Sequence, residues 1–223
     1  MSHGRLALPQ GIAVGASILS ADFAELGNEI AAAIGAGAGF IHVDVMDGHF
    51  VPNLSMGPAV CSAVRRAAPR APVDVHLMVQ RPLSFIEPFA KAGADWCTVH
   101  VEAQDDPREC AERSRSLGMK AGLAFNPRTP VEHAIDAGLL DAADFILIMS
   151  VQPGYSGQSF MPEVLMKARS LRRSGWQGPI EIDGGVSPQN AEACRAAGCT
   201  LLVSASAIFG SGDYAAAINA MLA

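Results

Sequence analysis

The feature that most constrains the fold is an alternation repeated along the whole chain. Eight short apolar runs alternate with eight longer, alanine-rich amphipathic stretches, and over 223 residues each pair takes about 28 residues. A short apolar run favours a buried strand, and an amphipathic stretch favours a helix. The runs predict strands at residues 13–19, 40–45, 73–77, 96–101, 120–125, 145–150, 180–183 and 200–204. The stretches predict helices at residues 22–36, 58–68, 82–92, 107–117, 130–137, 162–174, 188–197 and 214–222.

Proline and glycine mark the ends of these predicted helices. Six of the eight begin at a proline, which the first turn tolerates because its missing N–H would have no partner there. Glycine follows several of them, as a left-handed helix end requires. Eight consecutive βα units without a Pro/Gly/Ser-rich linker predict one α/β domain over residues 1–223, a closed (β/α)8 TIM barrel. An open doubly wound sheet is the alternative, but no GxGxxG motif follows the first strand.

The composition limits the partners and the compartment. Half of the residues are hydrophobic, which is enough for a large core, and 22 acidic against 16 basic residues give a formal net charge of −6. This charge argues against nucleic acid as a partner. Five cysteines without a CxxC pair argue against a disulfide framework and favour a reducing cytoplasm. Because Pro9, Gly11 and Gly15 interrupt the apolar N-terminal stretch, we expect neither a signal peptide nor a membrane span.

Charged residues gather where the predicted strands end, which is the functional face of a barrel. His42 and Asp44 share one face of their strand because side chains alternate. His76 and Asp183 come near the ends of two other strands. Two imidazoles and two carboxylates suit a borderline divalent cation such as zinc, iron(II), manganese or cobalt. We therefore hypothesise one divalent metal ion held by these four side chains.

The remaining polar residues have less definite interpretations. Asp74 and Glu181 fall on the same strand faces, one layer deeper, where they either orient the metal ligands or pair with each other as polar fillers. Three strand-end residues, taken singly, are interpreted as ordinary hydrogen-bonding groups: Ser17, His100 and Asn126. Three more are interpreted as loop or helix-surface groups: Asp47, His49 and His133.

A second site is indicated by small residues. The segments PGYSG (153–157), DGG (183–185) and SAS (204–206) follow the sixth, seventh and eighth strands. Small residues let backbone N–H groups approach an anion, and residues 205–209 can begin a short helix after the last strand. None of these segments contains lysine or arginine. Neutral donors and helix dipoles would therefore hold a phosphate group there.

These motifs together carry a family resemblance along nearly the whole chain. The matching stretches are SILSADF (17–23), HVDVMDGHFVPN (42–53), VDVHLMV (73–79), HVEA (100–103), GLAFNPRTP (122–130), PGYSGQSF (153–160), EIDGG (181–185) and SASAIF (204–209). In their order and spacing they resemble the ribulose-phosphate 3-epimerase family. The resemblance implies a TIM barrel of the ribulose-phosphate-binding type. It also implies an enzyme that interconverts D-ribulose 5-phosphate and D-xylulose 5-phosphate with one divalent metal ion.

The resemblance also implies roles for individual residues. Asp44 and Asp183 would be the acid/base pair, and the metal ligands would be His42, Asp44, His76 and Asp183. The substrate would be held by Ser17, His76, Gly154, Tyr155, Ser156, Gly157, Gly184, Gly185, Ala205 and Ser206. Three methionines would surround the reacting carbon: Met46, Met78 and Met149. Alanine-rich helix faces either pack against another subunit, in which case we expect a homo-oligomer, or form ordinary surface.

Departures from the family pattern leave the substrate open. The family usually has Phe-Gly at Tyr155 and Ser156, an acidic residue or Asn at Gln152, and Gly at Ala205. A 3-epimerase of another ketose phosphate, such as a hexulose 6-phosphate, is therefore an alternative. A non-catalytic phosphosugar-binding barrel is a second alternative, although the presence of both aspartates argues against it. A Schiff-base aldolase is disfavoured because the chain has no lysine at the carboxyl end of a predicted strand.

Overall fold

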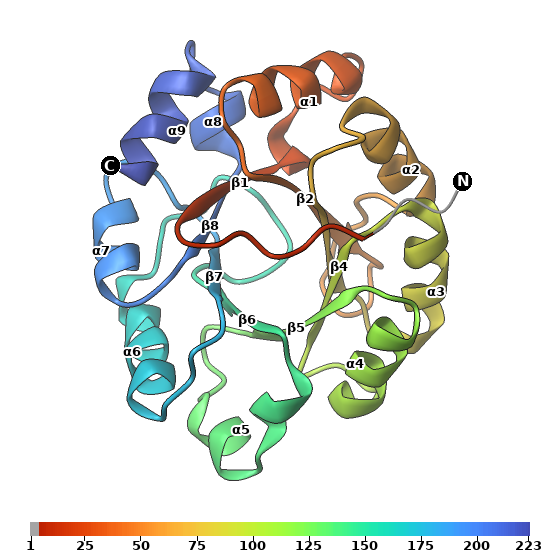
Figure 1. The fold of residues 1–223 in the computed structure, drawn as a ribbon, viewed down its shortest axis with the longest axis vertical. Helices are drawn as coiled ribbons and strands as arrows, with labels where there is room; N and C mark the ends of the chain where they lie inside the picture. Colours follow the sequence, from red (N-terminus) through yellow and green to blue (C-terminus); the bar gives the residue numbers. More distant parts are fainter. Residues whose placement is uncertain (1–4) are drawn as a thin grey trace.

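The computed structural model describes residues 5–223, which form a closed barrel of eight parallel strands surrounded by helices (Figure 1). The strands follow one another in chain order around the barrel, and the last pairs with the first. The predicted TIM barrel is therefore confirmed. The strands are β1 (Ala13–Ser17), β2 (Phe40–Met46), β3 (Val73–Met78), β4 (Trp96–His100), β5 (Lys120–Phe125), β6 (Phe145–Met149), β7 (Ile180–Asp183) and β8 (Leu201–Ser204).

Helices connect consecutive strands on the outside of the barrel. The α-helices are α1 (Leu26–Gly35), α2 (Pro58–Ala67), α3 (Leu83–Ala92), α4 (Pro107–Ser116), α5 (Glu132–Asp136), α6 (Leu165–Arg173), α7 (Ala191–Ala196), α8 (Ser206–Phe209) and α9 (Tyr214–Leu222). Three short 3₁₀ turns join them: η1 (Ile18–Ser20), η2 (Leu139–Ala142) and η3 (Pro162–Val164). The short helix predicted after the eighth strand is present as α8.

Several predicted element ends were wrong. The strand predicted at 13–19 ends at Ser17, whose hydroxyl accepts the Leu19 N–H at 3.3 Å and starts η1. The helix predicted from Pro188 begins only at Ala191, because the Asn190 side chain first closes a turn on the Ser187 N–H. The helices predicted at 22–36 and 130–137 also begin later, at α1 and α5, and the first turn of the helix predicted at 162–174 is the 3₁₀ turn η3.

The amino end of the barrel is filled by apolar side chains. Phe40, Trp96, Phe145 and Leu201 pack together inside it, and Leu8 from the N-terminal segment packs against them. The indole N–H of Trp96 donates to the Leu6 carbonyl at 3.0 Å. Figure 1 shows this N-terminal segment crossing the end of the barrel. Because this end is closed, the polar residues of the interior lie toward the opposite end.

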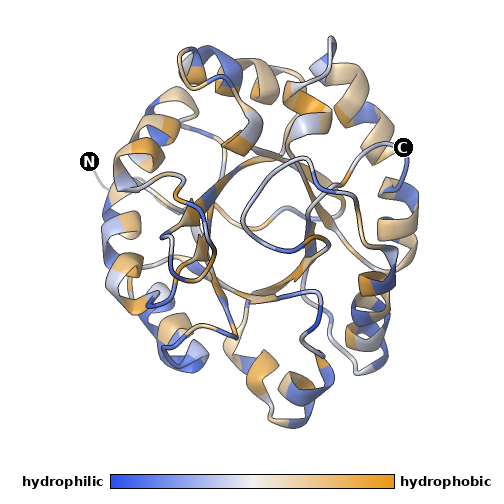
Figure 2. Ribbon diagram, turned by 180° about the vertical axis from the view of Figure 1, so that it is seen from behind, coloured by the Kyte–Doolittle hydropathy of each residue, from blue (hydrophilic) through white to orange (hydrophobic). Residues whose placement is uncertain are grey.

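Side chains alternate along each strand, so those that do not point into the barrel point outward toward the helices. The outward-facing valines and isoleucines of the strands belong to one large core with the inner faces of the helices. Figure 2 shows apolar strands in the centre and helices that carry polar residues among apolar ones around them. Within residues 5–223, no helix is long and apolar enough to cross a membrane.

Candidate active site

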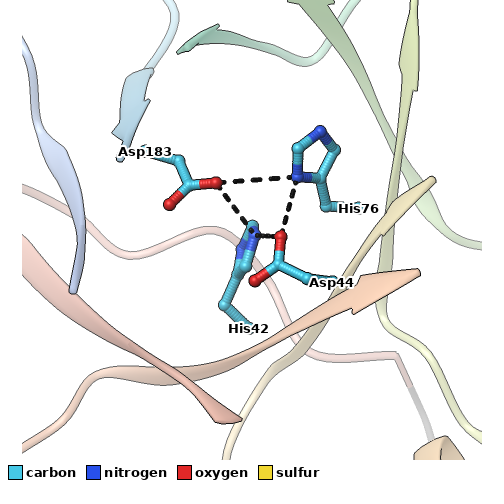
Figure 3. Close-up of side chains that lie close together, drawn as sticks. All are labelled: His42, Asp44, His76 and Asp183. Carbon is cyan, nitrogen blue, oxygen red and sulfur yellow. Dashed lines mark hydrogen bonds and ion pairs between the residues drawn. The ribbon is translucent and has the colours of Figure 1, made fainter. Parts of the chain in front are cut away.

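Four side chains converge inside the barrel at the carboxyl ends of three strands (Figure 3). His42 and Asp44 come from β2, and His76 lies beside Asp44 because the β2–β3 register pairs these two positions. Asp183 ends β7, on the other side of β1 and β8. The Asp44 Oδ1 atom lies 3.3 Å from His42 Nε2 and 3.1 Å from His76 Nδ1. The Asp183 Oδ2 atom lies 3.9 Å and 3.7 Å from the same two nitrogens.

The spacing of these four atoms fits a divalent cation. Ligands at about 2.0–2.2 Å from a tetrahedral metal ion lie about 3.3–3.6 Å from one another, close to the distances found here. His42 Nε2 is buried and has no hydrogen-bond partner among residues 5–223, and an orphaned buried nitrogen is costly. Nitrogen and oxygen donors without a thiolate suit a borderline cation. The four side chains can therefore hold one metal ion, as the sequence predicted.

The two aspartates of this cluster differ in protonation. Burial by itself would raise the pKa of Asp44, but His42 and His76 more than offset it and hold this pKa well below its usual range. Burial raises the pKa of Asp183 to about 7, and the charge of Asp44 adds to the effect. Burial lowers the pKa of His76 to about 4, so this ring is neutral at neutral pH. Before any cation binds, one carboxyl group is an acceptor and the other can carry a proton.

A pocket opens above the four side chains. Both aspartates reach it, and Ser17 lines it beside Asp44, with its hydroxyl donating to Asp44 Oδ2 at 2.6 Å. His76 is fully buried below this floor and is not among the lining residues. The other predicted substrate and reaction-centre residues line the pocket: Met46, Met78, Met149, Gly154, Tyr155, Ser156, Gly157, Gly184, Gly185, Ala205 and Ser206.

The glycines of the DGG segment are required by the backbone on one side of this pocket. Gly184 and Gly185 have φ angles of +118° and +66°, which side chains disfavour. A Cβ on Gly185 would lie 2.8 Å from the Gln158 carbonyl oxygen, so the loop after β6 approaches it closely. The Ser150 hydroxyl contacts the Asp183 and Gly184 carbonyl oxygens at 2.9 and 2.6 Å. The packing of these two loops thus fixes where Asp183 lies.

Comparisons with known proteins show the family of this chain. A sequence model of the Ribulose-phosphate 3 epimerase family matches residues 13–209. The chain belongs to the ribulose-phosphate 3-epimerase family. It is 47% identical over 217 residues to the ribulose-phosphate 3-epimerase of Synechocystis sp., covering 95% of this chain and 93% of the relative. It is 46% identical over 209 residues to that of Escherichia coli K12, covering 92% of each chain.

Solved structures support the fold of this family member. The 3-hexulose-6-phosphate synthase from Salmonella typhimurium superposes with a TM-score of 0.73 over 94% of this chain and 96% of the synthase. At 15% identity the likeness concerns the barrel alone. The family assignment therefore depends on the sequence relatives.

The loop after β6, which carries three of the departures from the family pattern, contacts the loop after β2. The Asn53 side chain donates to the Gly154 carbonyl at 2.7 Å, and the Tyr155 hydroxyl donates to the Pro52 carbonyl at 2.9 Å. A phenylalanine at position 155 would have no hydroxyl to make the second bond. The Gln152 carbonyl accepts a hydrogen bond from the Gln158 side chain at 2.7 Å, so the loop after β6 is also braced internally.

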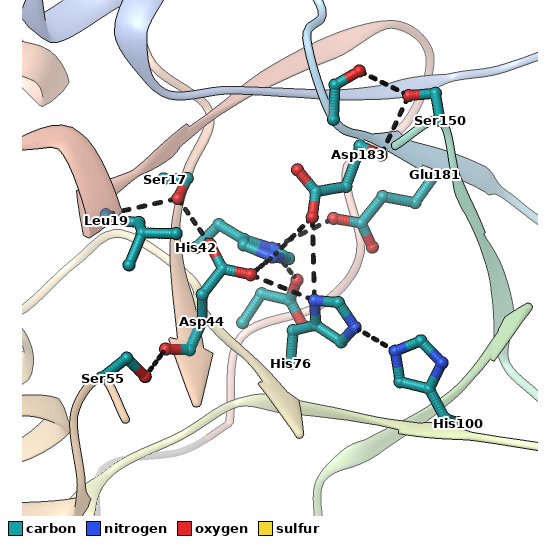
Figure 4. A network of polar contacts seen from close by, with 12 residues as sticks. Ser17, Leu19, His42, Asp44, Ser55, His76, His100, Ser150, Glu181 and Asp183 are labelled. Atoms are coloured by element: carbon teal, nitrogen blue, oxygen red, sulfur yellow. Dashed lines mark hydrogen bonds and ion pairs between the residues drawn. The ribbon is translucent and has the colours of Figure 1, made fainter. Parts of the chain in front are cut away.

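Two buried carboxyl groups face His42 on the side away from the pocket, those of Asp74 and of Glu181, the latter labelled in Figure 4. The Asp74 Oδ2 atom lies 2.7 Å from His42 Nδ1, and Glu181 Oε1 lies 3.3 Å from it. Neither oxygen of Glu181 has a hydrogen-bond partner in the described chain, so the alternative in which Asp74 and Glu181 pair with each other is wrong. Burial raises the pKa of Glu181 well above its usual value, and the charge of Asp74 adds to it. Asp74 is placed to hold the Nδ1–H of His42 and leave Nε2 facing the cluster.

The other histidine of the cluster has a partner that sequence reasoning had set aside. His76 Nε2 lies 2.8 Å from His100 Nε2, and His100 Nδ1 lies 3.1 Å from Glu102 Oε2. The sequence alone predicts an ordinary hydrogen-bonding role for His100. Strand alternation gave no signal for this contact, because β4 ends at His100 and Glu102 lies in the turn that follows.

Sequence reasoning also missed residues of the pocket and its loops. Leu19, Val151 and Gln158 line the pocket, but apolar and amide groups in loops carry no signal of their own. Asp47 had been interpreted as a surface group. Its carboxylate accepts N–H groups from Phe50 at 2.9 Å and from Gln80 at 2.8 Å, which ties the loop after β2 to the end of β3.

Proposed function

We propose that this enzyme inverts C3 of a ketose phosphate and interconverts D-ribulose 5-phosphate and D-xylulose 5-phosphate. One observation carries the proposal: two carboxyl groups, Asp44 and Asp183, reach the floor of one pocket from strands three positions apart around the barrel. Inverting a carbon beside a ketone requires that a proton leave from one face and that another arrive on the opposite face. Two acid/base groups on opposite sides meet that requirement. A single barrel over residues 1–223 suffices for this chemistry.

In the proposed mechanism the two aspartates exchange roles with the direction of reaction. The ionised Asp44 takes the C3 proton, the electron pair of the broken C–H bond forms a planar enediolate, and the protonated Asp183 gives its proton to the other face of C3. In the reverse direction Asp183 is the base and Asp44 the acid. The Ser17 hydroxyl holds Asp44 Oδ2, which keeps this carboxylate oriented toward the substrate. Met46, Met78 and Met149 exclude water from the reacting carbon.

We propose that His42, Asp44, His76 and Asp183 hold one divalent cation, with zinc first and iron(II), manganese or cobalt as other candidates. When bound, such a cation acts as a Lewis acid that stabilises the negative charge developing on the substrate oxygens. The tetrahedral spacing and the unpartnered His42 Nε2 support this assignment.

The phosphate group is proposed to lie at the end of the pocket lined by Gly154, Tyr155, Ser156, Gly157, Gly184, Gly185, Ala205 and Ser206. Lysine and arginine are absent from the described residues that line it, so backbone N–H groups and hydroxyls would hold the anion. The acidic net charge supports a small-molecule substrate rather than nucleic acid as partner. We further propose that the enzyme is a homo-oligomer, which light scattering of the purified protein tests. We also propose that it works in the cytoplasm.

Metal removal tests the proposed function. Chelated protein should lose at least about a hundredfold in turnover of D-ribulose 5-phosphate, because a base alone cannot ionise a C–H bond beside a ketone at a useful rate. Zinc, iron(II), manganese and cobalt added singly should restore turnover to different extents. A hexulose 6-phosphate serves as the comparison substrate, and its faster turnover would change the substrate but keep the mechanism. Full activity of the chelated protein with D-ribulose 5-phosphate would contradict the proposal.

A further inference from the structure

The loop after β6 lies against the loop after β2 beside the pocket. Gly154 is buried in this contact, and a Cβ placed on it would lie 3.6 Å from the Val51 Cβ atom. The Asn53 side chain donates to the Gly154 carbonyl at 2.7 Å. The Tyr155 hydroxyl donates to the Pro52 carbonyl at 2.9 Å. Because Tyr155 is 55% exposed, its ring adds little to the core, and its hydroxyl is what ties it to the neighbouring loop.

The loop after β2 is itself held at several points. Its Asp47 carboxylate accepts the Gln80 N–H at 2.8 Å, next to the end of β3. The Ser55 hydroxyl donates to the Asp44 carbonyl at 2.6 Å, at the end of β2. Val51 is buried and packs against two methionines of the pocket wall. This loop can therefore serve as a fixed support for the loop after β6.

The loop after β6 has free backbone donors where it lines the pocket. Residues 154–157 are all lining residues. The hydrogen bonds that they make within residues 5–223 use two carbonyl oxygens and the Tyr155 hydroxyl, and none uses an N–H group. Consecutive N–H groups without protein partners can bind an anion. They can do so well only if the loop keeps its shape and place.

Few bonds hold this part of the loop. At its base, the Met161 N–H donates to the Ser150 carbonyl at 2.9 Å. Within it, the Gln158 amide donates to the Gln152 and Tyr155 carbonyl oxygens at 2.7 and 2.9 Å. In the described chain, the two bonds to the loop after β2 are the only hydrogen bonds that join residues 152–157 to another part of the barrel. Loops with few such bonds open locally at low cost, so each bond matters.

We propose that Tyr155 is a positioning residue that ties the loop after β6 to the loop after β2 and thereby holds the N–H groups of residues 154–157 in place for the substrate phosphate. The inference rests on the phosphate end of the proposed function, and it concerns affinity and not proton transfer. A loop that is ordered before the ligand arrives loses less conformational freedom on binding. One hydrogen bond changes an equilibrium by about two- to tenfold, and we expect an effect of this size on phosphate affinity.

Tyr155→Phe is the direct test because it removes the hydroxyl and keeps the ring. The probe is D-ribitol 5-phosphate, which carries a phosphate on a five-carbon chain but has no carbonyl group and cannot be epimerised. Its dissociation constant from the metal-loaded protein, measured by calorimetry, should rise about two- to tenfold. The KM for D-ribulose 5-phosphate should rise by a similar factor, and kcat should change less, because the tie does not involve Asp44 or Asp183.

Limited proteolysis tests the position of the loop without any ligand. Chymotrypsin cleaves after tyrosine and after phenylalanine, so it can attack residue 155 in both proteins. Cleavage there should be faster in Tyr155→Phe, after correction with two synthetic peptides of residues 150–160 that differ only at position 155. A hydroxyl that instead contacted the phosphate would weaken binding without changing cleavage, and that result would overturn the positioning role.

Tyr214→Phe is the matched control. Tyr214 is the other tyrosine of the chain, and its hydroxyl donates to Glu29 at 3.0 Å, between α9 and α1. It is not among the residues that line the pocket. This variant should match the wild type in probe binding, in KM and in cleavage at residue 155.

The outcomes distinguish this inference from the proposed function. Weaker probe binding and faster cleavage in Tyr155→Phe, with wild-type behaviour of Tyr214→Phe, would support it. Unchanged probe binding, unchanged cleavage, or equal changes in Tyr214→Phe would overturn the inference and leave the proposed function standing. A wild-type protein that does not bind D-ribitol 5-phosphate would contradict both the inference and the phosphate site of the proposed function.

Discussion

At the scale of single residues, Asp44 and Asp183 bear the same functional group in different surroundings. Asp44 lies against His42 and His76 and accepts the Ser17 hydroxyl, so it is held ionised. Asp183 is buried near Asp44, and its pKa is raised to about 7. Environments that separate the pKa values of two carboxyl groups assign one as base and the other as acid. The metal-free protein thus already has the asymmetry that the proposed two-base epimerisation would require.

The variant Asp183→Asn tests that asymmetry. Loss of one acid/base group typically costs about a hundred- to ten-thousandfold in rate, and we expect turnover in both directions to fall by that factor. Asp44 remains, so one epimer should still exchange its C3 proton with heavy water while the other does not. Metal content should be measured in parallel, since an asparagine oxygen is a weaker ligand.

The exposed Asp141→Asn on η2 is the matched control for this variant and should retain full activity. Equal exchange of both epimers by Asp183→Asn, or unchanged turnover, would contradict the two-base mechanism.

Sequence reasoning located the four metal-site side chains because strand alternation and barrel topology are enough to bring them together. It did not place Glu102 against His100, because Glu102 lies past the end of β4, where alternation no longer sets the direction of a side chain. It also did not foresee the bond between Tyr155 and Pro52, since loops far apart in sequence meet only in the folded barrel.

At the scale of elements, two arginines on opposite sides of the barrel make the same kind of contact. Each donates to one carbonyl just after a helix and to another just before a strand. Arg172 of α6 donates to the Gly198 carbonyl after α7 at 2.7 Å and to the Gly178 carbonyl before β7 at 2.7 Å. Arg65 of α2 donates to the Gly93 carbonyl after α3 at 3.1 Å and to the Ala71 carbonyl before β3 at 2.8 Å. A guanidinium fork can reach carbonyl oxygens of two connections at once, and an ammonium group cannot match that geometry.

We therefore expect Arg172→Lys to lower the free energy of unfolding by about 1–3 kcal/mol, since partly buried carbonyl groups lose their donors. The site lies at the other end of the barrel strands, so activity at moderate temperature should be retained. Urea denaturation measures the effect.

The neighbouring Arg173→Lys provides the control for Arg172→Lys. Arg173 is exposed, its bond is to the Ser170 hydroxyl at 3.0 Å, and its replacement should change stability by less than about 0.5 kcal/mol. Equal effects of the two substitutions would contradict the role given to Arg172.

The element ends show where sequence patterns stop being informative. Proline predicted the starts of α2 and α4 correctly, because there it occupies the first helical turn. Pro188 predicted a helix start that is wrong, because proline suits the second position of a turn as well as the first turn of a helix. The competing Asn190 side-chain turn delays α7 until Ala191. The order of elements was predictable from periodicity, whereas their ends depended on which local hydrogen bond formed.

At the scale of the whole molecule, the reactivity of the five cysteine thiols measures whether the barrel is folded. All five are buried and unpaired in the structure. Burial raises the pKa of the Cys61 and Cys110 thiols to about 12 and that of Cys194 to about 11. The nucleophile in disulfide exchange is the thiolate, so a raised pKa and burial both slow the reaction.

The native protein at pH 8 should therefore react slowly with an aromatic disulfide reagent. All five thiols should react promptly after unfolding in guanidinium chloride. The count of fast-reacting thiols, followed by absorbance, measures this. A thiol that reacts within seconds in the native protein would contradict the packing described for it.

Asp44 and Asp183 are proposed to move protons on opposite faces of C3 in a pentulose phosphate. The most direct test is to incubate the metal-loaded enzyme with D-ribulose 5-phosphate in heavy water and to follow C3 by NMR. We expect D-xylulose 5-phosphate that carries deuterium at C3. Protein that holds its metal ion yet yields neither the epimer nor deuterium at C3 would contradict it.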